Sequence, residues 1–312
     1  MEQLTVGIIG CGRMGGERAA AVQKLGARIG WFCDPDRARA VELANKFGGV
    51  VTAQPEDLDW HSLDAVFVCV PPFYRGPVEQ YCLANSIPFF VEKPIGLSAK
   101  HIVSLVEQVK RVGIVNAVGY MNRCRNSVRF AKKILLGRKV LGISCVWVGK
   151  KYRVPWWIDK NLSGGPFNEQ ATHVLDLCRF LIGEVESVSA LAAPSTTAGD
   201  PEFGVAVALR FLDGPVGTLF YSCEARGKDI HLHVFCEEGS LDLEGWDFAM
   251  TRNTIDGELP ETEQDEIFVK ETQSFLNAIR CHDQLLIDCD LEEAYRTQLV
   301  VDRVRDSFNQ SR

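Results

Sequence analysis

The sequence predicts an α/β domain with a doubly wound parallel sheet, followed by an α+β domain with a large, mostly antiparallel sheet. Over the first 120 residues, apolar runs of strand length alternate with stretches of helical spacing. Later strands follow one another through short turns, with no helices between them. A length of 312 residues with 46% hydrophobic residues is enough for two cores. We therefore expect one domain over 1–120 and a second over 121–312.

The predicted strands of the first domain are apolar runs, and helical spacing follows most of them. The runs are LTVGII (4–9), RIGWFC (28–33), DAVFVCV (64–70), PFFVE (88–92) and IVNAVGY (114–120). The helices are predicted over 14–25, over 35–47, after Tyr74 and over 98–112, with Ser98 as the N-cap of the last. Strands that alternate with helices in this way form a parallel sheet with helices on both faces.

The second domain is predicted to begin with helices near 126–136 and 168–182. Its strands are ESVSALAA (186–193), VAVALRF (205–211), VGTLFYSC (216–223), DIHLHVFC (229–236) and GSLDLEG (239–245). The segments 212–217 and 236–240 contain glycine and have the length of hairpin connections. Loops are predicted over 193–202 and 253–266, and helices near 267–280 and 291–308 close the chain.

The charge and the apolar pattern argue against several kinds of partner. A net charge of −7 and a pI of about 5.5 do not fit nucleic-acid binding, which needs a basic surface. No apolar run reaches about 18 residues, so we expect no membrane span. The N-terminus lacks the basic region of a signal peptide. We therefore expect a cytoplasmic protein.

The 11 cysteines include no CxxC pair, and most lie in apolar, strand-like runs. These are Cys33, Cys69, Cys145, Cys223 and Cys236. This pattern is typical of reduced, buried thiols. His231 and His233 share one face of a strand but have no third ligand nearby, so we predict no metal site.

A glycine-rich turn, GCGRMG (10–15), follows the first strand and opens the first helix. Gly10 allows the tight turn, Gly12 lets a pyrophosphate approach the backbone, and Gly15 lets the helix pack closely on the strand. The helix N-terminus, with Arg13 and Met14, directs N–H groups toward the phosphates. This context predicts a dinucleotide-binding Rossmann domain.

Asp34 ends the second strand, 19 residues after Gly15. A carboxylate at this place accepts hydrogen bonds from the adenosine ribose hydroxyls and repels a 2′-phosphate. We therefore expect NAD(H) to be preferred. Arg37, three residues further on, keeps NADP(H) open as an alternative, because its guanidinium could meet a 2′-phosphate.

A second informative stretch is GGPFNEQATHVLD (164–176). In an α-helix that begins near Asn168, Glu169 and His173 stand at i and i+4, within contact of each other. A carboxylate partner fixes the tautomer of a histidine, as in a general base. A pair that only decorates the helix surface is the alternative. For Asp176 we expect a structural role, such as pairing with a backbone group or an arginine.

A charged pair, Glu92 and Lys93, follows the strand 88–92 and precedes Pro94. Together with the glycine turn and the GG…E…H…D segment, this Glu-Lys-Pro motif resembles the Gfo/Idh/MocA family of nicotinamide-dependent oxidoreductases, over nearly the whole chain. The resemblance implies that Lys93 and His173 are catalytic. Glu169, which stands where many members have Asp, would orient His173 or bind a substrate hydroxyl.

The resemblance also implies cofactor contacts by Glu92, Lys93, Val70 and Pro71. In VCVPPFYRG (68–76) the chain departs from the Thr-Pro-Asn of similar proteins, so the contacts to the nicotinamide ribose are expected to differ. Arg75 either favours an anionic substrate or is an exposed arginine at the start of a helix.

The aromatic and cationic segment GKKYRVPWWIDK (149–160) precedes the helix that carries His173. Its candidate substrate residues are Tyr152, Arg153, Trp156 and Trp157, whose rings suit the apolar faces of a sugar or polyol. A subunit contact or a rim loop is an equal alternative.

The resemblance implies a reversible transfer of hydride between NAD(P) and the secondary alcohol or ketone of a sugar, polyol, cyclitol or related small molecule. Alternatives are an NAD-dependent glycoside hydrolase with transient internal oxidation, and a non-catalytic dinucleotide sensor or scaffold. The resemblance also implies a homodimer or homotetramer, because the open face of the second sheet often packs on another subunit in similar proteins.

Overall fold

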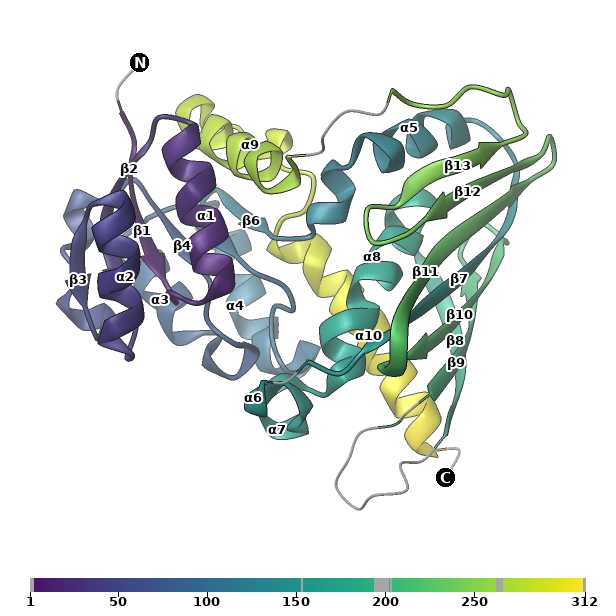
Figure 1. Cartoon of the computed structure of the whole chain (residues 1–312), viewed down its shortest axis with the longest axis horizontal. Helices are drawn as coiled ribbons and strands as arrows, with labels where there is room; N and C mark the ends of the chain where they lie inside the picture. The colour runs from purple at the N-terminus through teal and green to yellow at the C-terminus, as the bar shows by residue number, and fades with distance from the viewer. Residues whose placement is uncertain (1–2, 153, 194–201, 203, 262–265, 311–312) are drawn as a thin grey trace. The chain divides into compact units, whose positions relative to one another are not determined.

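The computed structural model describes residues 3–152, 154–193, 202, 204–261 and 266–310 (Figure 1). The chain forms two compact units. The first contains Met1–Met121 and Glu266–Tyr295, and the second contains Asn122–Asp265 and Arg296–Arg312. The sequence placed everything after residue 120 in the second domain, whereas the chain returns to the first unit for one helix and the start of another.

The first unit is built on a parallel sheet with the strand order β3-β2-β1-β4-β5-β6. The strands are β1 (Thr5–Ile9), β2 (Arg28–Cys33), β3 (Val50–Thr52), β4 (Ala65–Val68), β5 (Phe89–Val91) and β6 (Asn116–Val118). This confirms the predicted doubly wound sheet. The sequence missed β3, because three residues at a sheet edge, one of them buried, give too short an apolar signal.

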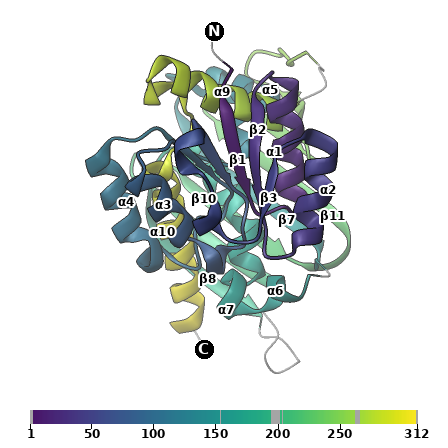
Figure 2. The same cartoon turned by 90° about the vertical axis from the view of Figure 1, so that its left-hand side faces the viewer.

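Helices cover both faces of this sheet, with α1, α2 and α9 on one side and α3 and α4 on the other (Figure 2). Their bounds are α1 (Arg13–Lys24), α2 (Arg37–Phe47), α3 (Pro77–Ala84), α4 (Ala99–Val112) and α9 (Ile267–Cys281). The strands are apolar on both faces because both faces are covered. Ser98 occupies the N-cap position of α4, but its hydroxyl contacts the His101 ring at 2.8 Å and makes no capping bond to the backbone.

Helix α9 belongs to the first unit because its apolar face packs on the sheet. Phe275 is fully buried, and its ring lies edge-on to Phe67 and Phe90, with centroids 5.4 and 5.7 Å away. Such aromatic contacts add to the free energy of burial. The sequence placed this helix correctly along the chain but could not show on which sheet it packs.

The second unit contains a seven-stranded sheet with the order β13-β12-β11-β7-β10-β9-β8. Its strands are β7 (Val140–Lys150), β8 (Val185–Ala193), β9 (Gly204–Phe211), β10 (Val216–Ser222), β11 (Glu224–Cys236), β12 (Ser240–Glu244) and β13 (Ala249–Asn253). β7 and β10 are parallel and the other neighbours antiparallel, which confirms a mostly antiparallel sheet. The predicted hairpins connect β9 to β10 and β11 to β12.

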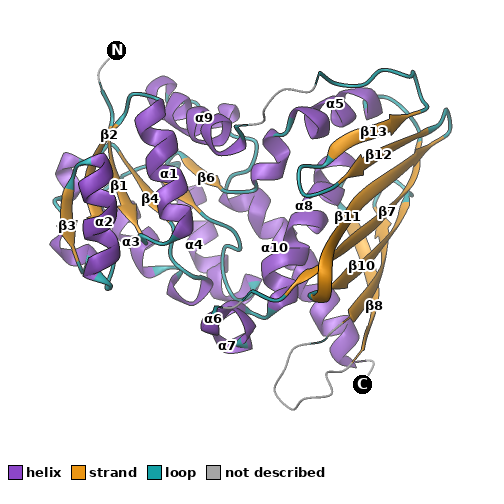
Figure 3. Ribbon diagram, in the orientation of Figure 1, coloured by secondary structure: helices purple, strands orange, loops and turns teal. Residues whose placement is uncertain are grey.

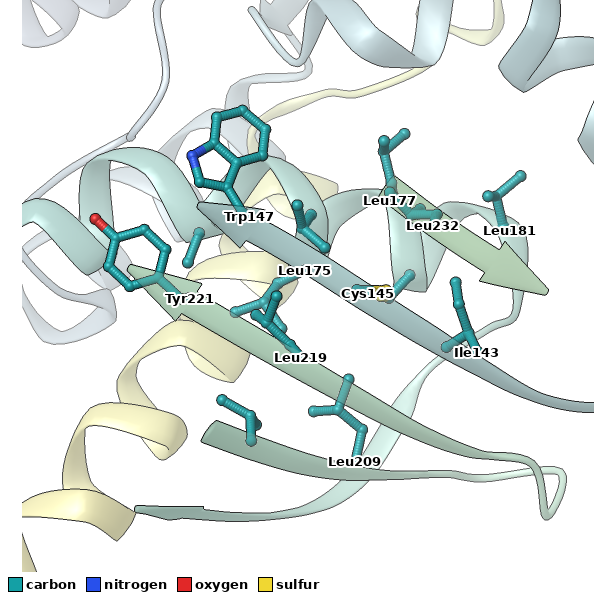
Figure 4. Packing of buried hydrophobic residues seen from close by; sticks show 14 of the residues in the cluster. Ile143, Cys145, Trp147, Leu175, Leu177, Leu181, Leu209, Leu219, Tyr221 and Leu232 are labelled. Carbon is teal, nitrogen blue, oxygen red and sulfur yellow. Dashed lines mark hydrogen bonds between the residues drawn. The ribbon is translucent and has the colours of Figure 1, made fainter. Parts of the chain in front are cut away.

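Strands β7 and β13 were absent from the predicted sheet, although Cys145 had been placed in a strand-like run. β7 lies in the middle of the sheet, where Ile143, Cys145 and Trp147 alternate into the core (Figure 4). Residues 140–150 were not assigned to the sheet from the sequence, although buried and half-buried residues alternate along them. The predicted loops at 193–202 and 253–266 lie partly outside the described residues.

Helices cover one face of this sheet and leave the other open (Figure 3). They are α5 (Asn126–Leu135), α8 (Thr172–Leu181) and α10 (Leu291–Gln310), which begins in the first unit. Two short helices, α6 (Pro155–Ile158) and α7 (Lys160–Ser163), precede α8 in the chain. The regular part of the helix predicted from 168 begins only at Thr172. A π-helix, Phe167–Ala171, precedes it.

All eleven cysteines are free, and nine of them are buried. Burial raises the pKa of Cys11 and of Cys33 to about 12, so these thiols stay protonated. Among the described residues, no helix is both long enough and apolar enough to cross a membrane.

We expect Phe275→Ala to loosen the first unit selectively. Removing a buried phenylalanine ring costs about 3–5 kcal/mol. Hydrogen exchange should therefore accelerate in β4 and β5, while β7 and β11 keep their protection. Leu285→Ala is the control, because this side chain is 92% exposed. Equal acceleration in β7 and β11 would show that α9 does not stabilise the first unit in particular.

Candidate active site

The glycine turn has the geometry that a bound pyrophosphate requires. Gly10 has φ 95°, and a Cβ there would lie 2.6 Å from the carbonyl carbon of Cys69. A Cβ at Gly15 would lie 2.1 Å from the carbonyl oxygen of Gly10. Both positions therefore need glycine. A Cβ at Gly12 would meet no atom within 4 Å, so space is open beside the backbone where α1 begins. Arg13 and Met14 form the first turn of α1, whose N–H groups are available to an anion.

Asp34 lies directly after β2, and its carboxylate is fixed by the backbone. One oxygen accepts the N–H of Cys11 at 2.7 Å, and the other accepts the N–H of Asp36 at 2.8 Å. The side chain is buried, yet each oxygen keeps a lone pair for a ribose hydroxyl. Arg37 is exposed at the first position of α2. The turn and Asp34 thus lie together, and these residues fit a dinucleotide.

Lys93 follows β5 at the carboxyl end of the sheet, where ligands bind in open α/β folds. Its side chain is half-buried, and the Lys93–Pro94 peptide is cis. Glu92 is buried, and its carboxylate accepts a hydrogen bond from Arg18 Nε at 2.7 Å. Strand β5 thus delivers Lys93 to the same sheet edge that carries the glycine turn.

Arg18 also pairs with Glu271 on α9, at 2.6 Å. Burial alone would lower the pKa of Arg18, but the two carboxylates outweigh it and raise that pKa. Burial raises the pKa of Glu271 to about 7, against the Arg18 charge and with help from Glu92. The buried guanidinium of Arg18 therefore pairs with two carboxyl groups, those of Glu92 and Glu271.

Val70 and Pro71, the predicted nicotinamide-ribose neighbours, follow β4 and are half-buried. Arg75 is not the exposed arginine that was one alternative for it. It is half-buried, and its guanidinium donates to the carbonyl oxygens of Val68 at 2.8 Å and Glu92 at 2.5 Å. This arginine connects the ends of β4 and β5.

His173 and Glu169 belong to the second unit and are both buried. His173 stands in the first turn of α8, whereas Glu169 lies in the π-helix before it. The α-helical i, i+4 argument therefore does not apply directly to this pair. The imidazole stacks on the indole of Trp147, with ring centroids 5.6 Å apart and planes at 13°. This stack fixes the plane of the His173 ring.

The predicted structural role of Asp176 is confirmed. Arg123 donates to both carboxylate oxygens, from Nε at 2.8 Å and from Nη2 at 2.6 Å. Thr297 on α10 donates to the same carboxylate at 3.0 Å. This buried network ties α8 to its neighbours three residues beyond His173.

The aromatic side chains of the candidate substrate segment differ in how deeply they are buried. Tyr152 is 41% exposed, Trp156 is half-buried, and Trp157 is buried in the core of the second unit. Tyr152 lies edge-on to Trp157, with ring centroids 5.1 Å apart. Arg153 lies outside the described residues. Substrate contact by these side chains stays a prediction.

His231 and His233 are bound to carboxylates. His231 Nδ1 lies 3.3 Å from Asp229, and His233 Nδ1 lies 2.7 Å from Asp242. In the part of the chain that the structure describes, no group of three or more His, Cys, Asp or Glu residues could hold a metal ion.

Three residues beside the candidate catalytic groups escaped the sequence analysis or were assigned otherwise: Arg18, Arg75 and Trp147. Arg18 could have been noticed, because it shares a helix face with Gly15 and Val22, which are both buried. Trp147 could have been found by recognising the alternation of β7. Nothing in the local pattern around Arg75 indicates its carbonyl partners.

Comparison with known proteins identifies both parts of the chain. The family model described as "Oxidoreductase family, NAD-binding Rossmann fold" of the GFO/IDH/MocA group matches residues 4–120. The model of the GFO/IDH/MocA C-terminal domain matches residues 138–242.

Similar proteins include two bacterial enzymes and a solved structure. A 2,7-anhydro-N-acetylneuraminate hydratase of Escherichia coli is 25% identical, over 77% of this chain and 68% of its own. A scyllo-inositol 2-dehydrogenase (NAD(+)) of Bacillus subtilis is 28% identical, over 77% of this chain and 73% of its own. The structure of a UDP-N-acetylglucosamine 3-dehydrogenase from Acidithiobacillus ferrooxidans superimposes with a TM-score of 0.88 at 19% identity, over 99% of each chain.

Proposed function

Because the chain belongs to the Gfo/Idh/MocA family of oxidoreductases, we propose that it transfers a hydride between a nicotinamide cofactor and a secondary alcohol or ketone of a sugar, polyol or cyclitol. One observation in each unit carries the proposal. In the first unit, Lys93 lies at the sheet edge that holds the glycine turn. In the second, His173 lies on a helix that a buried ion pair anchors. The dehydrogenase name of a relative that acts on an inositol supports this substrate class.

In the proposed reaction, each residue acts on the alcohol group. His173 accepts the hydroxyl proton as general base. Lys93 polarises the oxygen and stabilises the negative charge that develops on it. Glu169 orients His173 or binds a neighbouring hydroxyl. When bound, the nicotinamide supplies the hydride acceptor. The Trp147 stack holds the His173 ring in one plane and thereby limits the directions in which its nitrogens point.

We propose NAD(H) as the preferred cofactor. The Asp34 carboxylate is fixed by two backbone N–H groups, so it cannot turn away from a 2′-phosphate without breaking those bonds. Arg37, by contrast, is exposed on α2, so burial does not hold its side chain in one position.

We also propose that the protein forms a homo-oligomer through the open face of the second sheet. Large apolar side chains are exposed there, and Phe220 is 48% and Leu191 69% exposed. Both line one shallow hollow of this face together with Val148 and Ala206. A second copy of the chain would bury this apolar area.

We also propose a cytoplasmic location, because all eleven cysteines are free and the cytosol keeps thiols reduced. Cell fractionation would test it, and recovery in a membrane or secreted fraction would contradict it.

The central prediction concerns His173. We expect wild type to change the absorbance at 340 nm with at least one polyol, cyclitol, sugar or diol, and His173→Ala to lower kcat/KM about 10²- to 10⁴-fold. His101→Ala is the control, because His101 is exposed on α4. A loss below about tenfold would exclude His173 as the base.

The same assay separates the alternatives. Product formation without net NADH would indicate a hydrolase or another reaction with transient oxidation. NADH binding by fluorescence without any turnover would indicate a sensor. The relatives do not favour either alternative, although one of them is named a hydratase.

For the cofactor, we expect Asp34→Asn to raise the NADP⁺-to-NAD⁺ ratio of kcat/KM about tenfold, because the negative charge beside the 2′ position is lost. Arg37→Met should leave this ratio within about twofold. A wild type that prefers NADP⁺, or an unchanged ratio in Asp34→Asn, would contradict the assignment.

For assembly, light scattering coupled to size exclusion should show a dimer or tetramer. The double variant Leu191→Glu/Phe220→Glu should shift it toward monomer, because charges would enter the apolar contact. Leu136→Glu is the control at another exposed leucine, 83% exposed. A monomeric wild type at micromolar concentration would exclude the proposal.

A further inference from the structure

Glu92, the residue that precedes Lys93, is held at three separate points. Its N–H donates to the carbonyl oxygen of Val68 at 3.0 Å. Its own carbonyl oxygen accepts from Arg75 Nη2 at 2.5 Å, and its carboxylate accepts from Arg18 Nε at 2.7 Å. The main chain and the side chain of Glu92 are therefore both anchored, and the next Cα is that of Lys93.

Arg18 reaches Glu92 from α1, the helix that begins at the glycine turn. It is fully buried, and its remaining nitrogens donate to Glu271 at 2.6 Å and to Thr272 at 3.3 Å, both on α9. Its guanidinium also lies over the ring of Phe90 on β5, 4.1 Å from the centroid. The cation is thus held on several sides and gives Glu92 a fixed partner.

Gly119, just after β6, leaves the room that this ion pair needs. A Cβ at this position would lie 2.7 Å from Glu92 Oε2 and 3.1 Å from Arg18 Nη2. A larger residue would push the pair apart. The space around Glu92 therefore admits the Arg18 guanidinium only because residue 119 has no side chain.

A buried ion network is a poor device for stability alone. Desolvating one guanidinium and two carboxylates is costly, and well-packed apolar side chains of similar volume often serve equally well. Its place in this chain, directly beside the lysine at the sheet edge, indicates a different use. The flexible stem of a lysine extends from its Cα, so anchoring the backbone beside Lys93 limits the region that its ammonium can reach.

We propose that Arg18 and Arg75 are positioning residues that hold Glu92 by its carboxylate and its carbonyl, and thereby place Lys93 for catalysis. The inference rests on the proposed function for its catalytic consequence, but the placement of Lys93 is a property of the first unit alone. A displacement of about 1 Å in a catalytic group can cost about 100-fold in rate.

The test uses the full-length protein, four single arginine variants, and the Lys93→Met variant with and without Arg75→Met. Arg75→Met removes both carbonyl contacts, and Arg75→Lys can restore only one of them. Arg18→Lys keeps the buried charge but loses the planar, five-donor fork of the guanidinium. Arg39→Met is the matched control, because Arg39 is an exposed arginine in the same unit that pairs with Asp36 at the surface.

The first measurement requires no substrate. Acylation of lysines by an N-hydroxysuccinimide ester, read by mass spectrometry, gives the rate at Lys93 relative to the exposed Lys100 on α4. We expect Arg75→Met and Arg18→Lys to change this ratio by about threefold or more, because the reach and surroundings of Lys93 change. Arg39→Met should leave it unchanged. An unchanged ratio in both test variants would overturn the inference.

The second measurement uses turnover. Arg75→Met should lower kcat by about 10- to 100-fold, with Arg75→Lys intermediate and NADH binding within about twofold of wild type. In a Lys93→Met background, Arg75→Met should cause no further loss, because its effect acts through Lys93. An equal loss in that background would show a merely structural role and overturn the inference.

The two measurements keep this inference separate from the proposed function. A changed labelling ratio in a protein that oxidises no substrate would support the placement of Lys93 and contradict the proposed dehydrogenase. If the wild type is active, and Lys93→Met abolishes this activity while both arginine variants keep it, the result would support the proposed dehydrogenase and contradict the placement of Lys93 by the two arginines.

Discussion

The guanidinium of Arg18 joins three segments of the first unit that lie far apart in the sequence. It connects α1 to Glu92, 74 residues away, and to Glu271, 253 residues away. Because the cation is fully buried, removing it would leave the buried carboxyl groups of Glu92 and Glu271 without their cationic partner. The glycine turn, the end of β5 and the returning helix α9 are therefore fixed relative to one another by one side chain. Lys93 and the dinucleotide turn share this support.

The second unit fixes its candidate catalytic group by another buried charge. Asp176 is held by Arg123 and Thr297, and this anchors α8 one turn beyond His173. Trp147 then limits the imidazole from β7. The position of the helix and the plane of the ring have separate supports. This division suits a general base, whose nitrogen must lie within hydrogen-bond distance of one proton.

The two sheets contribute to function in different ways, because one is covered by helices on both faces and the other on only one. The parallel sheet is covered on both sides, so its function gathers at the carboxyl ends of its strands, where loops leave the core. The antiparallel sheet is covered on one side by α5, α8 and α10. Its covered face supports the helix that carries His173, and its open face exposes the apolar side chains of β8 and β10.

The sequence by itself determined the features whose signals are local. The turn from Gly10 to Gly15 and Asp34 at the end of β2 were predicted, because strand, turn and helix follow one another within about 30 residues. His173 was proposed as a general base from its spacing to Glu169, and the family resemblance added the catalytic roles of Lys93 and His173. The structural role of Asp176 was also foreseen, but not its partners.

Only the tertiary structure decided what depends on distant partners. It showed that α9 packs on the first sheet, that β7 lies in the middle of the second, and that a π-helical turn carries Glu169. It also showed that Arg18 and Arg75 hold Glu92. Spacing along a chain reports on neighbours within one or two turns or strands. An arginine that is buried against carboxylates up to 253 residues away has the same local pattern as one that faces water.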